Sequence, residues 1–420
     1  MWQEIKNIYH LGIAILANLF YGFPSKKIRV IGVTGTDGKT TTTSLIYHIL
    51  NTAGVNASMV TSVGAVINGK NYDVGFHVTT PSSFAIQRFL AKAACPSKLK
   101  ERSGVGNPSS RVAPRLPFLV LETTSHALDQ YRVFGIDFEV GVLTNVSHEH
   151  LDYHKTYENY VKTKVKLLKI AKIAIVNRDD ESYGMIKDEG LMIKDKVRLV
   201  TYGLNKNSDV NPKTFPFKTN LIGEFNVYNS LAAIAACKAL KISDEDIRRG
   251  LKSFKPPLGR EDIVYDKNFK VMIDFAHTPN AFDQILKSIH PSIKGRLIHV
   301  FGSAGQRDAS KRPLMGELSS KYADVIILTA EDPRSEKISK IMDDIFSGIQ
   351  NSKFKIQNLL RIEDRKKAIE TAIRMARKGD FILVTGKSHE KSMNYGHGEV
   401  AWDEYGVVRD ALKQFSNLAI

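Results

Sequence analysis

Short apolar runs recur along the first part of the chain, separated by longer stretches of helical periodicity. The runs lie at residues 28–33, 118–121, 140–143 and 173–176, and each has the length of a buried strand. A glycine-rich turn follows the first run, and the next stretch predicts a helix over about residues 40–51. Strands that alternate with helices are typical of parallel sheets covered on both faces, so the pattern predicts a doubly wound, mostly parallel α/β domain.

A second series of apolar runs follows residues 256–259 (Pro-Pro-Leu-Gly), whose composition is typical of a linker. Its strand candidates are residues 271–273, 297–301, 325–328 and 381–384, which predict a smaller, Rossmann-like α/β domain. The expected organisation is a short N-terminal helix over 1–27, a central domain over 28–258 and a C-terminal domain over 259–420. Residues 96–117, rich in Ser, Gly, Pro, Lys and Arg, favour a flexible surface insertion.

The N-terminal segment contains one apolar stretch, residues 9–23, which is shorter than the about 20 residues that span a bilayer. It includes His10 and Asn18, and no small-residue cleavage site follows it, so a signal peptide is not predicted. The simplest interpretation is an amphipathic helix packed on the protein. A helix lying on a membrane surface is the alternative, and the sequence leaves both open.

The formal net charge of +16 changes this picture little. No aromatic-rich basic strand and no basic recognition helix stand out, so nucleic acid is not expected as a partner. A basic solvated surface or attraction of small anionic substrates accounts for the charge. The two cysteines, Cys95 and Cys237, lie far apart and form no Cys-x-x-Cys motif. This spacing does not suggest a disulfide framework or a zinc site, and it favours a reducing, cytoplasmic setting.

The turn after the first strand has the composition of a phosphate-binding loop, or P-loop. Its residues, between a predicted strand and a predicted helix, are Gly35, Thr36, Asp37, Gly38, Lys39, Thr40 and Thr41. Glycines let backbone N–H groups surround phosphate oxygens, and the helix N-terminus adds partial positive charge. Lys39 is expected to neutralise the β- and γ-phosphates and the Thr40 hydroxyl to ligate Mg²⁺. The stricter G-x-x-x-x-G-K-[ST] pattern is not met, because Val33 occupies the position of its first glycine.

Acidic and histidine residues follow two other predicted strands. Glu122 comes directly after the run 118–121, and residues 148–154, which include three histidines, follow the strand that ends near Asn145. Ligands bind at the carboxyl ends of strands in open α/β sheets. Oxygen and imidazole ligands beside a phosphate loop suit a divalent metal that bridges ATP and a second substrate. Each residue alone, His154 included, is more often a surface or capping group, and their shared position is what favours a metal site.

Several segments resemble, in the same order, the signatures of the Mur ligase family. They are the phosphate loop from Thr34 to Thr41, Glu122-Thr123-Thr124-Ser125-His126-Ala127-Leu128, Thr144-Asn145 with His150-Leu151-Asp152-Tyr153-His154, Asn177-Arg178-Asp179-Asp180, Gly223-Glu224-Phe225-Asn226-Val227-Tyr228-Asn229, Asp274-Phe275-Ala276-His277-Thr278-Pro279, Gly305-Gln306-Arg307-Asp308 with Lys311-Arg312-Pro313, Asp332-Pro333-Arg334, and Gly386-Lys387-Ser388-His389-Glu390. The resemblance extends from about residue 28 to the C-terminus.

The resemblance implies an ATP-dependent amide-bond ligase of peptidoglycan precursor synthesis that requires Mg²⁺. In this family ATP phosphorylates a carboxylate, and an amine then displaces phosphate from the acyl phosphate. The expected substrates are UDP-N-acetylmuramyl-dipeptide and an amino acid, meso-diaminopimelate or L-lysine. A cytoplasmic monomer is expected, and contact of residues 9–23 with a membrane surface stays open.

The resemblance also implies roles for individual residues. Lys39, Glu122, His150 and Lys164 are expected to be catalytic, with Thr40, Glu122, His150 and Lys164 as metal ligands. Lys164 corresponds to a lysine that the family carries as a carbamate, which turns a cation into a metal-binding anion. The alternative is that Lys162, Lys164, Lys166 and Lys169 form one solvated helical face.

Binding residues follow from the same correspondence. For ATP they are the phosphate loop with Asn229, Arg260, Asp274 and His277, although Asn229 also suits a helix N-cap. For the nucleotide-linked peptide they are Thr79, Thr80, Thr124, Gln130 and Arg132. For the amino acid they are Arg307, Glu331, Asp332, Pro333, Arg334, Gly386 and Glu390. The alternative for each charged residue is a surface ion pair of little energetic weight.

The sequence departs from the family pattern at several places. Relatives carry an N-terminal domain that holds the UDP group, whereas 33 residues precede Thr34 here, too few for such a domain. We therefore expect the UDP group to be held differently, or another carrier to replace it. Diaminopimelate-specific relatives resemble the pattern Asp-Asn-Pro-Arg, and this chain has Asp332 at the position of the Asn. Arg334 matches that pattern and favours diaminopimelate. Asp37 and Ser388 are milder changes.

Alternative functions remain at this point. One is a Mur-like ligase that acts on another carboxylate, such as a folate polyglutamate, a cyanophycin-type chain or a lipid-linked wall precursor. Another is a non-catalytic ATP-binding subunit of a complex, against which Lys39, Glu122, His150 and Lys164 all argue.

Overall fold

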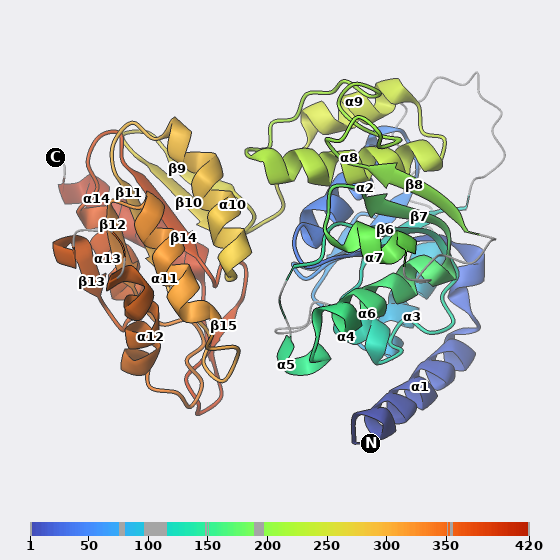
Figure 1. The fold of residues 1–420 in the computed structure, drawn as a ribbon, viewed down its shortest axis with the longest axis horizontal. Coiled ribbons are helices and arrows are strands. Elements are labelled where there is room, and N and C mark those ends of the chain that lie inside the picture. Colours follow the sequence, from blue (N-terminus) through green and yellow to red (C-terminus); the bar gives the residue numbers. More distant parts are fainter. Residues whose placement is uncertain are drawn as a thin grey trace. The chain divides into compact units, whose positions relative to one another are not determined.

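The computed structural model describes residues 2–74, 80–95, 116–147, 149, 151–188, 197–350, 352 and 356–418. The chain divides into two compact units (Figure 1). Unit 1 comprises Met1–Asn220 and Asn226–Lys255, and unit 2 comprises Leu221–Phe225 and Pro256–Ile420. The predicted insertion, residues 96–117, lies outside the described residues except for 116 and 117.

Unit 1 is built on an eight-stranded sheet with the order β4-β3-β2-β5-β1-β6-β7-β8. Its strands are β1 (Arg29–Thr34), β2 (Ala57–Val60), β3 (Ala65–Ile67), β4 (Lys70–Tyr72), β5 (Phe118–Glu122), β6 (Phe138–Leu143), β7 (Ala171–Asn177) and β8 (Arg198–Tyr202). Six neighbouring strands, β2, β5, β1, β6, β7 and β8, pair in parallel. The strands β3 and β4 add an antiparallel edge next to β2. Every residue of β5 is buried, as expected for a central strand covered on both faces.

Helices connect and cover these strands. They are α1 (Trp2–Tyr21), η1 (Pro24–Lys27), α2 (Lys39–Thr52), α3 (Ser83–Ala94), α4 (Ser125–Asp129), α5 (Leu151–His154), α6 (Tyr157–Ile170), α7 (Ser182–Asp188), α8 (Glu224–Ala239) and α9 (Asp244–Ser253). Apolar residues of α3, such as Phe89 and Leu90, form one core with Leu119 and Leu121 of β5. Residues of α6, such as Val161 and Val165, form another core with β6 and β7.

Unit 2 contains a six-stranded sheet with the order β13-β12-β11-β14-β10-β9. Its strands are β9 (Asp262–Asp266), β10 (Lys270–Asp274), β11 (Leu297–Phe301), β12 (Val325–Leu328), β13 (Leu359–Arg361) and β14 (Phe381–Thr385), with β15 (Ser392–Asn394) and β16 (Glu399–Ala401) forming a separate ribbon. Five strands are parallel, and β9 is an antiparallel edge.

Alternate side chains of this second sheet face two separate cores. Met272, Phe301 and Leu328 pack with α10 (Pro279–Ile289), α11 (Lys311–Tyr322) and α12 (Ile338–Gln350). Val271 and Val300 pack on the other side with α13 (Arg365–Arg374) and α14 (Glu404–Leu418). Two short helices, η3 (His290–Ser292) and η4 (Ile356–Asn358), complete the unit. The sheet is therefore covered on both faces.

The structure confirms the predicted fold class. Each predicted apolar run overlaps a parallel strand, and the helix after the phosphate loop extends over Lys39–Thr52. The parallel strands β2, β8 and β13, the antiparallel strands β3, β4 and β9 and the ribbon were not predicted, because their sequences lack a long continuous apolar run. The N-terminal helix begins earlier than residues 9–23 and runs over Trp2–Tyr21. Of the helices in the described part of the chain, none combines the length and apolar character needed to cross a bilayer.

Candidate active site

The phosphate loop joins β1 to α2 at the carboxyl edge of the unit 1 sheet. Gly38 has a φ of 78°, a left-handed conformation that favours glycine. A Cβ atom at Gly38 would lie 2.1 Å from Oδ1 of Asn229, so α8 closes directly on the loop. The same Oδ1 accepts a hydrogen bond from Thr42 at 3.3 Å. Asn229 lies inside α8, so its position supports the loop rather than capping a helix.

The strand end of β6 holds the other side of the loop. Asn145 accepts from the Asp37 backbone N–H at 2.9 Å and donates to the Asp37 carbonyl at 3.1 Å. Thr144 donates to the same carbonyl at 2.6 Å. The Thr36 backbone N–H donates to the Asn145 carbonyl at 2.9 Å. These bonds hold the backbone conformation of the loop, which reduces the ordering cost of phosphate binding.

Hydroxyl and carboxylate oxygens meet where α2 begins. The Thr40 hydroxyl donates to Oε2 of Glu122, the last residue of β5, at 3.0 Å. The Ser62 backbone N–H donates to the same oxygen at 3.0 Å, and the Ser62 and Thr40 hydroxyls are 3.2 Å apart. Oxygens of this kind are the ligands that Mg²⁺ prefers, so this donor set fits a magnesium ion beside the phosphate loop.

Lys164 reaches the phosphate loop from α6. Its side chain is buried, and Nζ donates to the Gly35 carbonyl at 2.6 Å and lies 4.2 Å from the centre of the Tyr160 ring. Burial lowers the pKa of Lys164 well below its ordinary value, and the nearby ammonium group of Lys39 lowers it further. Lys162 and Lys169 are exposed on the same helix, so the four lysines do not form one solvated face.

The segment after β6 is described only in part. His148 and His150 lie outside the described residues, so the predicted metal ligand His150 has no structural account. His154 is buried, and its Nε2 lies 2.9 Å from the Ser125 hydroxyl. Among the described residues, no group of three or more His, Cys, Asp or Glu side chains is placed to hold a metal ion.

Four of the five residues predicted to bind the nucleotide-linked peptide lie together. Arg132 donates through Nη1 to the Thr80 carbonyl at 2.9 Å, and through Nε and Nη2 to Oε1 of Gln130 at 3.0 and 2.6 Å. The Thr80 hydroxyl donates to that of Thr124 at 3.2 Å and accepts from the Thr124 backbone N–H at 2.9 Å. The fifth residue, Thr79, lies outside the described residues. This cluster adjoins Glu122, whose carbonyl accepts from the Thr80 hydroxyl at 3.2 Å.

In unit 2, the other predicted ATP residues lie at the carboxyl end of β10. Asp274 accepts from the backbone N–H groups of Glu261 at 2.8 Å and Ala276 at 2.7 Å. The Arg260 guanidinium stacks 4.6 Å from the centre of the Phe275 ring. His277 donates through Nδ1 to the Phe275 carbonyl at 2.8 Å, and burial lowers its pKa to about 3. His277 is therefore neutral at physiological pH.

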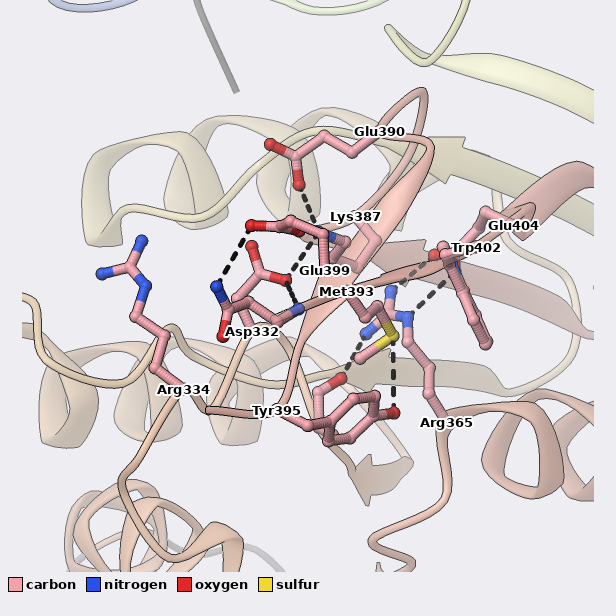
Figure 2. A network of polar contacts seen from close by, with 12 residues as sticks. Asp332, Arg334, Arg365, Lys387, Glu390, Met393, Tyr395, Glu399, Trp402 and Glu404 are labelled. Atoms are coloured by element: carbon pink, nitrogen blue, oxygen red, sulfur yellow. Dashed lines mark hydrogen bonds and ion pairs between the residues drawn. The ribbon is translucent and has the colours of Figure 1, made fainter. Parts of the chain in front are cut away.

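The predicted amino-acid residues gather around Lys387, whose side chain is fully buried (Figure 2). Its Nζ forms ion pairs with Asp332 at 2.9 Å and with Glu390 at 2.5 Å. Asp332 also accepts from the Asn394 backbone N–H of β15 at 3.0 Å. The charge of Asp332, which distinguishes this chain from an Asn at that position, is thus compensated by Lys387.

Glu331, next to Asp332 in the chain, has a carboxylate oxygen whose hydrogen-bonding capacity is not satisfied within the described part of the chain. It is 7% exposed, and no hydrogen-bond partner is found for Oε2 among the described residues. A Cβ atom at Gly386, whose φ is 102°, would lie 2.2 Å from that oxygen. Burial raises the pKa of Glu331 to about 7, against the opposing effect of nearby cations led by Lys311. The carboxyl group is therefore partly protonated near neutral pH.

Two guanidinium groups stand beside the Asp332 cluster. Arg334 donates through Nη1 to the Gly305 carbonyl at 3.1 Å, and Figure 2 shows its side chain extending away from Lys387. Burial lowers the pKa of Arg334, and the positive charge of Arg307 lowers it further. Both Asp332 and Arg334 have positive φ values, 46° and 51°, so the turn between them is held in an unusual conformation.

A buried ion pair contacts the end of the strand that precedes Gly386. Arg365 donates to Glu404 through Nε at 2.9 Å and Nη2 at 2.5 Å, and neither side chain is exposed. Arg365 also donates to the Thr385 carbonyl at 2.7 Å, at the end of the strand that leads to Gly386. Trp402 donates to the same glutamate at 2.8 Å (Figure 2).

Sequence reasoning did not assign several residues of these clusters. Ser62 contacts Glu122 partly through its backbone, which leaves no side-chain signal in a sequence. Asn145 and Lys387 lie within motifs that resemble the family, but their contacts depend on the folded positions of loops 108 and 55 residues away. The Gly386-Lys387 pair after an apolar run is the signal that could have identified Lys387.

Comparisons with known proteins match two family models to the chain. The model of the Mur ligase middle domain matches residues 33–237, and that of the Mur ligase glutamate ligase domain matches residues 259–388. The phosphate loop, Lys164 and Asn229 fall inside the first match, and Asp332, Arg334 and Lys387 fall inside the second, whereas Glu390 lies just beyond it.

Individual relatives match almost the whole chain. The UDP-N-acetylmuramoyl-L-alanyl-D-glutamate–2,6-diaminopimelate ligase 1 of Clostridium acetobutylicum is 36% identical over 96% of this chain and 82% of that protein. The corresponding ligase of Aquifex aeolicus is 38% identical over 94% of this chain and 80% of that protein. A solved structure of such a ligase has a TM-score of 0.58 and 27% identity, covering 92% of this chain and 78% of that one. The chain belongs to the Mur ligase family of ATP-dependent ligases.

Proposed function

We propose that the chain joins meso-diaminopimelate to UDP-N-acetylmuramoyl-L-alanyl-D-glutamate in peptidoglycan precursor synthesis. The observation that carries this proposal is the cluster of opposite charges in unit 2. The Arg307 and Arg334 guanidiniums suit a carboxylate. Asp332 and Glu390 share the single ammonium group of Lys387, so the three groups keep one net negative charge, which suits an ammonium group of the substrate. Diaminopimelate carries both kinds of group at both ends, whereas lysine has no second carboxylate. The names of the related diaminopimelate ligases support the same choice.

The reaction proceeds in two balanced steps. The γ-phosphoryl group of ATP passes to a carboxylate oxygen of the dipeptide, and ADP leaves. The amine nitrogen of the amino acid then attacks the acyl carbon, the C–O bond to phosphate breaks, and the amine loses a proton. Lys39 and the loop N–H groups bind the phosphates. Thr40 and Glu122 would hold Mg²⁺, which would supply positive charge beside the transferred group.

Lys164 is proposed to act as a carbamate formed from CO₂. An ammonium group buried without a carboxylate partner is costly, and among the described ion pairs none includes Lys164. The uncharged amine nitrogen bonds to the carbon of CO₂ and loses a proton to solvent, which leaves a carbamate anion. This anion would lie beside the phosphate loop, because Nζ already contacts the Gly35 carbonyl. His150 is retained as a proposed ligand of the metal ion.

A monomer in the cytoplasm is also proposed. Each unit has cores formed by its own residues, which supports a monomer. Cys95 is exposed and unpaired, and Cys237 is buried and unpaired, which suits a reducing compartment.

The test is phosphate release from ATP and Mg²⁺ by the full chain, with UDP-N-acetylmuramyl-dipeptide and meso-diaminopimelate, L-lysine or neither. We expect release only with the dipeptide and diaminopimelate together, accompanied by a tripeptide product in the mass spectrum. Release with lysine in preference would overturn the amino-acid assignment. If protein that binds ATP releases no phosphate with any pair, the carrier is not UDP, and folate-, cyanophycin- or lipid-linked carboxylates replace it. ATP binding without turnover on any carboxylate would indicate a non-catalytic subunit.

A further inference from the structure

Helix α1 has two different apolar sides. Ala14, Ala17 and Asn18 are buried where the helix lies along α3. Residues on the opposite side are exposed and recur at intervals of three and four positions, which places them in one stripe. These exposed residues are Ile5, Ile8, Tyr9, Ile15, Leu16, Leu19 and Phe20. We call them the α1 stripe.

Three polar side chains of α1 form hydrogen bonds with the rest of the protein. Gln3 donates to the Tyr153 hydroxyl at 2.9 Å, and Asn7 donates to Asp129 at 3.1 Å. Asn18 donates to the Phe134 carbonyl at 2.8 Å. A surface helix of a soluble domain normally has the reverse orientation, with its polar face toward water. These hydrogen bonds fix the rotation of α1, so the outward direction of the stripe follows from the native fold.

The stripe is long and strongly exposed. Ile8 is 69% exposed, Leu16 56% and Phe20 75%, so the stripe extends over most of the helix. In Figure 1 α1 (dark blue) extends from the rest of unit 1 with the N-terminus at its outer end. A contiguous apolar surface of this kind marks a site of interaction with another apolar surface.

Exposed aromatic and basic side chains continue the stripe at its C-terminal end. Phe20 lies 6.1 Å from Phe84 of α3 between ring centres, and both are exposed, as is Phe23. Lys26 and Lys27 follow and are exposed, with the Lys26 ammonium 5.2 Å from the Phe23 ring centre. Arg88 is exposed one turn after Phe84 on α3. From residue 5 to residue 27 the charged residues are Lys6, Lys26 and Lys27, all basic.

We propose that the α1 stripe docks the protein on an anionic lipid surface, with α1 lying in the plane of the interface. Apolar side chains enter the acyl boundary, aromatic rings lie at headgroup level, and lysines contact lipid phosphates. The basic rim is the feature that selects this occupant, because it complements an anionic surface. The proposal is independent of which carboxylate the ligase extends, and no catalytic residue lies in the stripe.

The experiment is co-flotation of the full chain with vesicles of phosphatidylcholine, alone or mixed with phosphatidylglycerol. Leu16→Gln/Phe20→Gln removes two apolar contacts, and Lys26→Gln/Lys27→Gln removes two rim charges. Leu314→Gln/Ile356→Gln is the matched control, since these exposed apolar residues lie in unit 2. Circular dichroism and ATP binding of each variant report whether the fold is retained.

We expect wild type and the control to float with anionic vesicles. The apolar variant should bind at least about tenfold more weakly, because each buried side chain contributes strongly to partitioning. The lysine variant should lose about fivefold per lysine on anionic vesicles only, and added salt should reproduce this loss.

Two results would overturn the proposal. The first is absence of flotation with either vesicle from correctly folded protein. The second is a concentration-dependent dimer that Leu16→Gln/Phe20→Gln abolishes and vesicles do not compete with, which would make a second copy of the chain the occupant of the stripe.

Discussion

At the scale of single residues, burial decides the chemistry of Lys164 and Glu331. A lysine among exposed lysines of one helix becomes distinct because it points at the phosphate loop instead of solvent. A glutamate near three basic residues keeps a raised pKa because desolvation outweighs their attraction. In both cases the charged form is disfavoured by loss of water, and the residue gains a property that its exposed neighbours lack.

Replacement of Lys164 by Met keeps the buried volume but removes the amine. We expect Lys164→Met to lower kcat by about 10²–10³, in line with loss of one transition-state contact. Lys162→Ala, on the exposed side of the same helix, should leave kcat unchanged. Isotope-labelled bicarbonate should give a carbamate signal in wild type and not in Lys164→Met. A signal that persists in the variant would assign the carbamate to another lysine.

The pKa of Glu331 predicts a dependence of stability on pH. Because the folded pKa of about 7 exceeds the ordinary value of 4.5, the folded state binds the proton more tightly, and stability falls as pH rises through this window. Glu331→Gln should therefore stabilise the protein at about pH 8 by up to about 3 kcal/mol, and by much less near pH 5. Urea unfolding at both pH values measures this, with exposed Glu317→Gln as control. An equal difference at both pH values would contradict the assignment.

At the scale of elements, α8 and β6 hold the phosphate loop from two sides. Gly38→Ala would place a methyl group against Asn229, in a backbone conformation that alanine disfavours. Gly54→Ala, at the other end of α2, has a similar φ of 74° but no atom within 4 Å of the added Cβ. Both variants should lose about 1 kcal/mol to backbone strain, and only Gly38→Ala should weaken ATP binding, by about tenfold or more. Calorimetric titration with ATP distinguishes them; equal affinities would show that the contact with Asn229 is not needed.

At the scale of the molecule, the two units have separate cores. Trp402 packs against the unit 2 core formed with α13 and α14, and the only other tryptophan is Trp2. In a Trp2→Phe variant, fluorescence therefore reports unit 2, while circular dichroism reports both units. We expect two unfolding transitions in urea, of which fluorescence follows one, because each core loses its contacts independently. Coincident transitions by both probes would show that the units unfold as one.

The sequence by itself determined the fold class and much of the candidate site. Buried parallel strands need continuous apolar runs, so β1, β5, β6, β10, β11 and β14 were predictable, and residues that follow such strands must lie at one edge of a sheet. Gly35, Lys39 and Thr40 carry their chemistry in residue type and local order. The short antiparallel strands were not predictable, because their pairing depends on neighbours rather than on an apolar run of their own.

Only the tertiary structure decided which of several similar residues is buried and which way a helix faces. Lys164 differs from Lys162 through its position against the phosphate loop, and Lys387 acquires its two carboxylates from separate segments. Helix α1 is apolar on both sides, so its periodicity predicts a helix without showing which side meets the protein. Long-range hydrogen bonds from Gln3, Asn7 and Asn18 make that choice, because their partners Tyr153, Asp129 and the Phe134 carbonyl are within reach only when this side of the helix faces the protein.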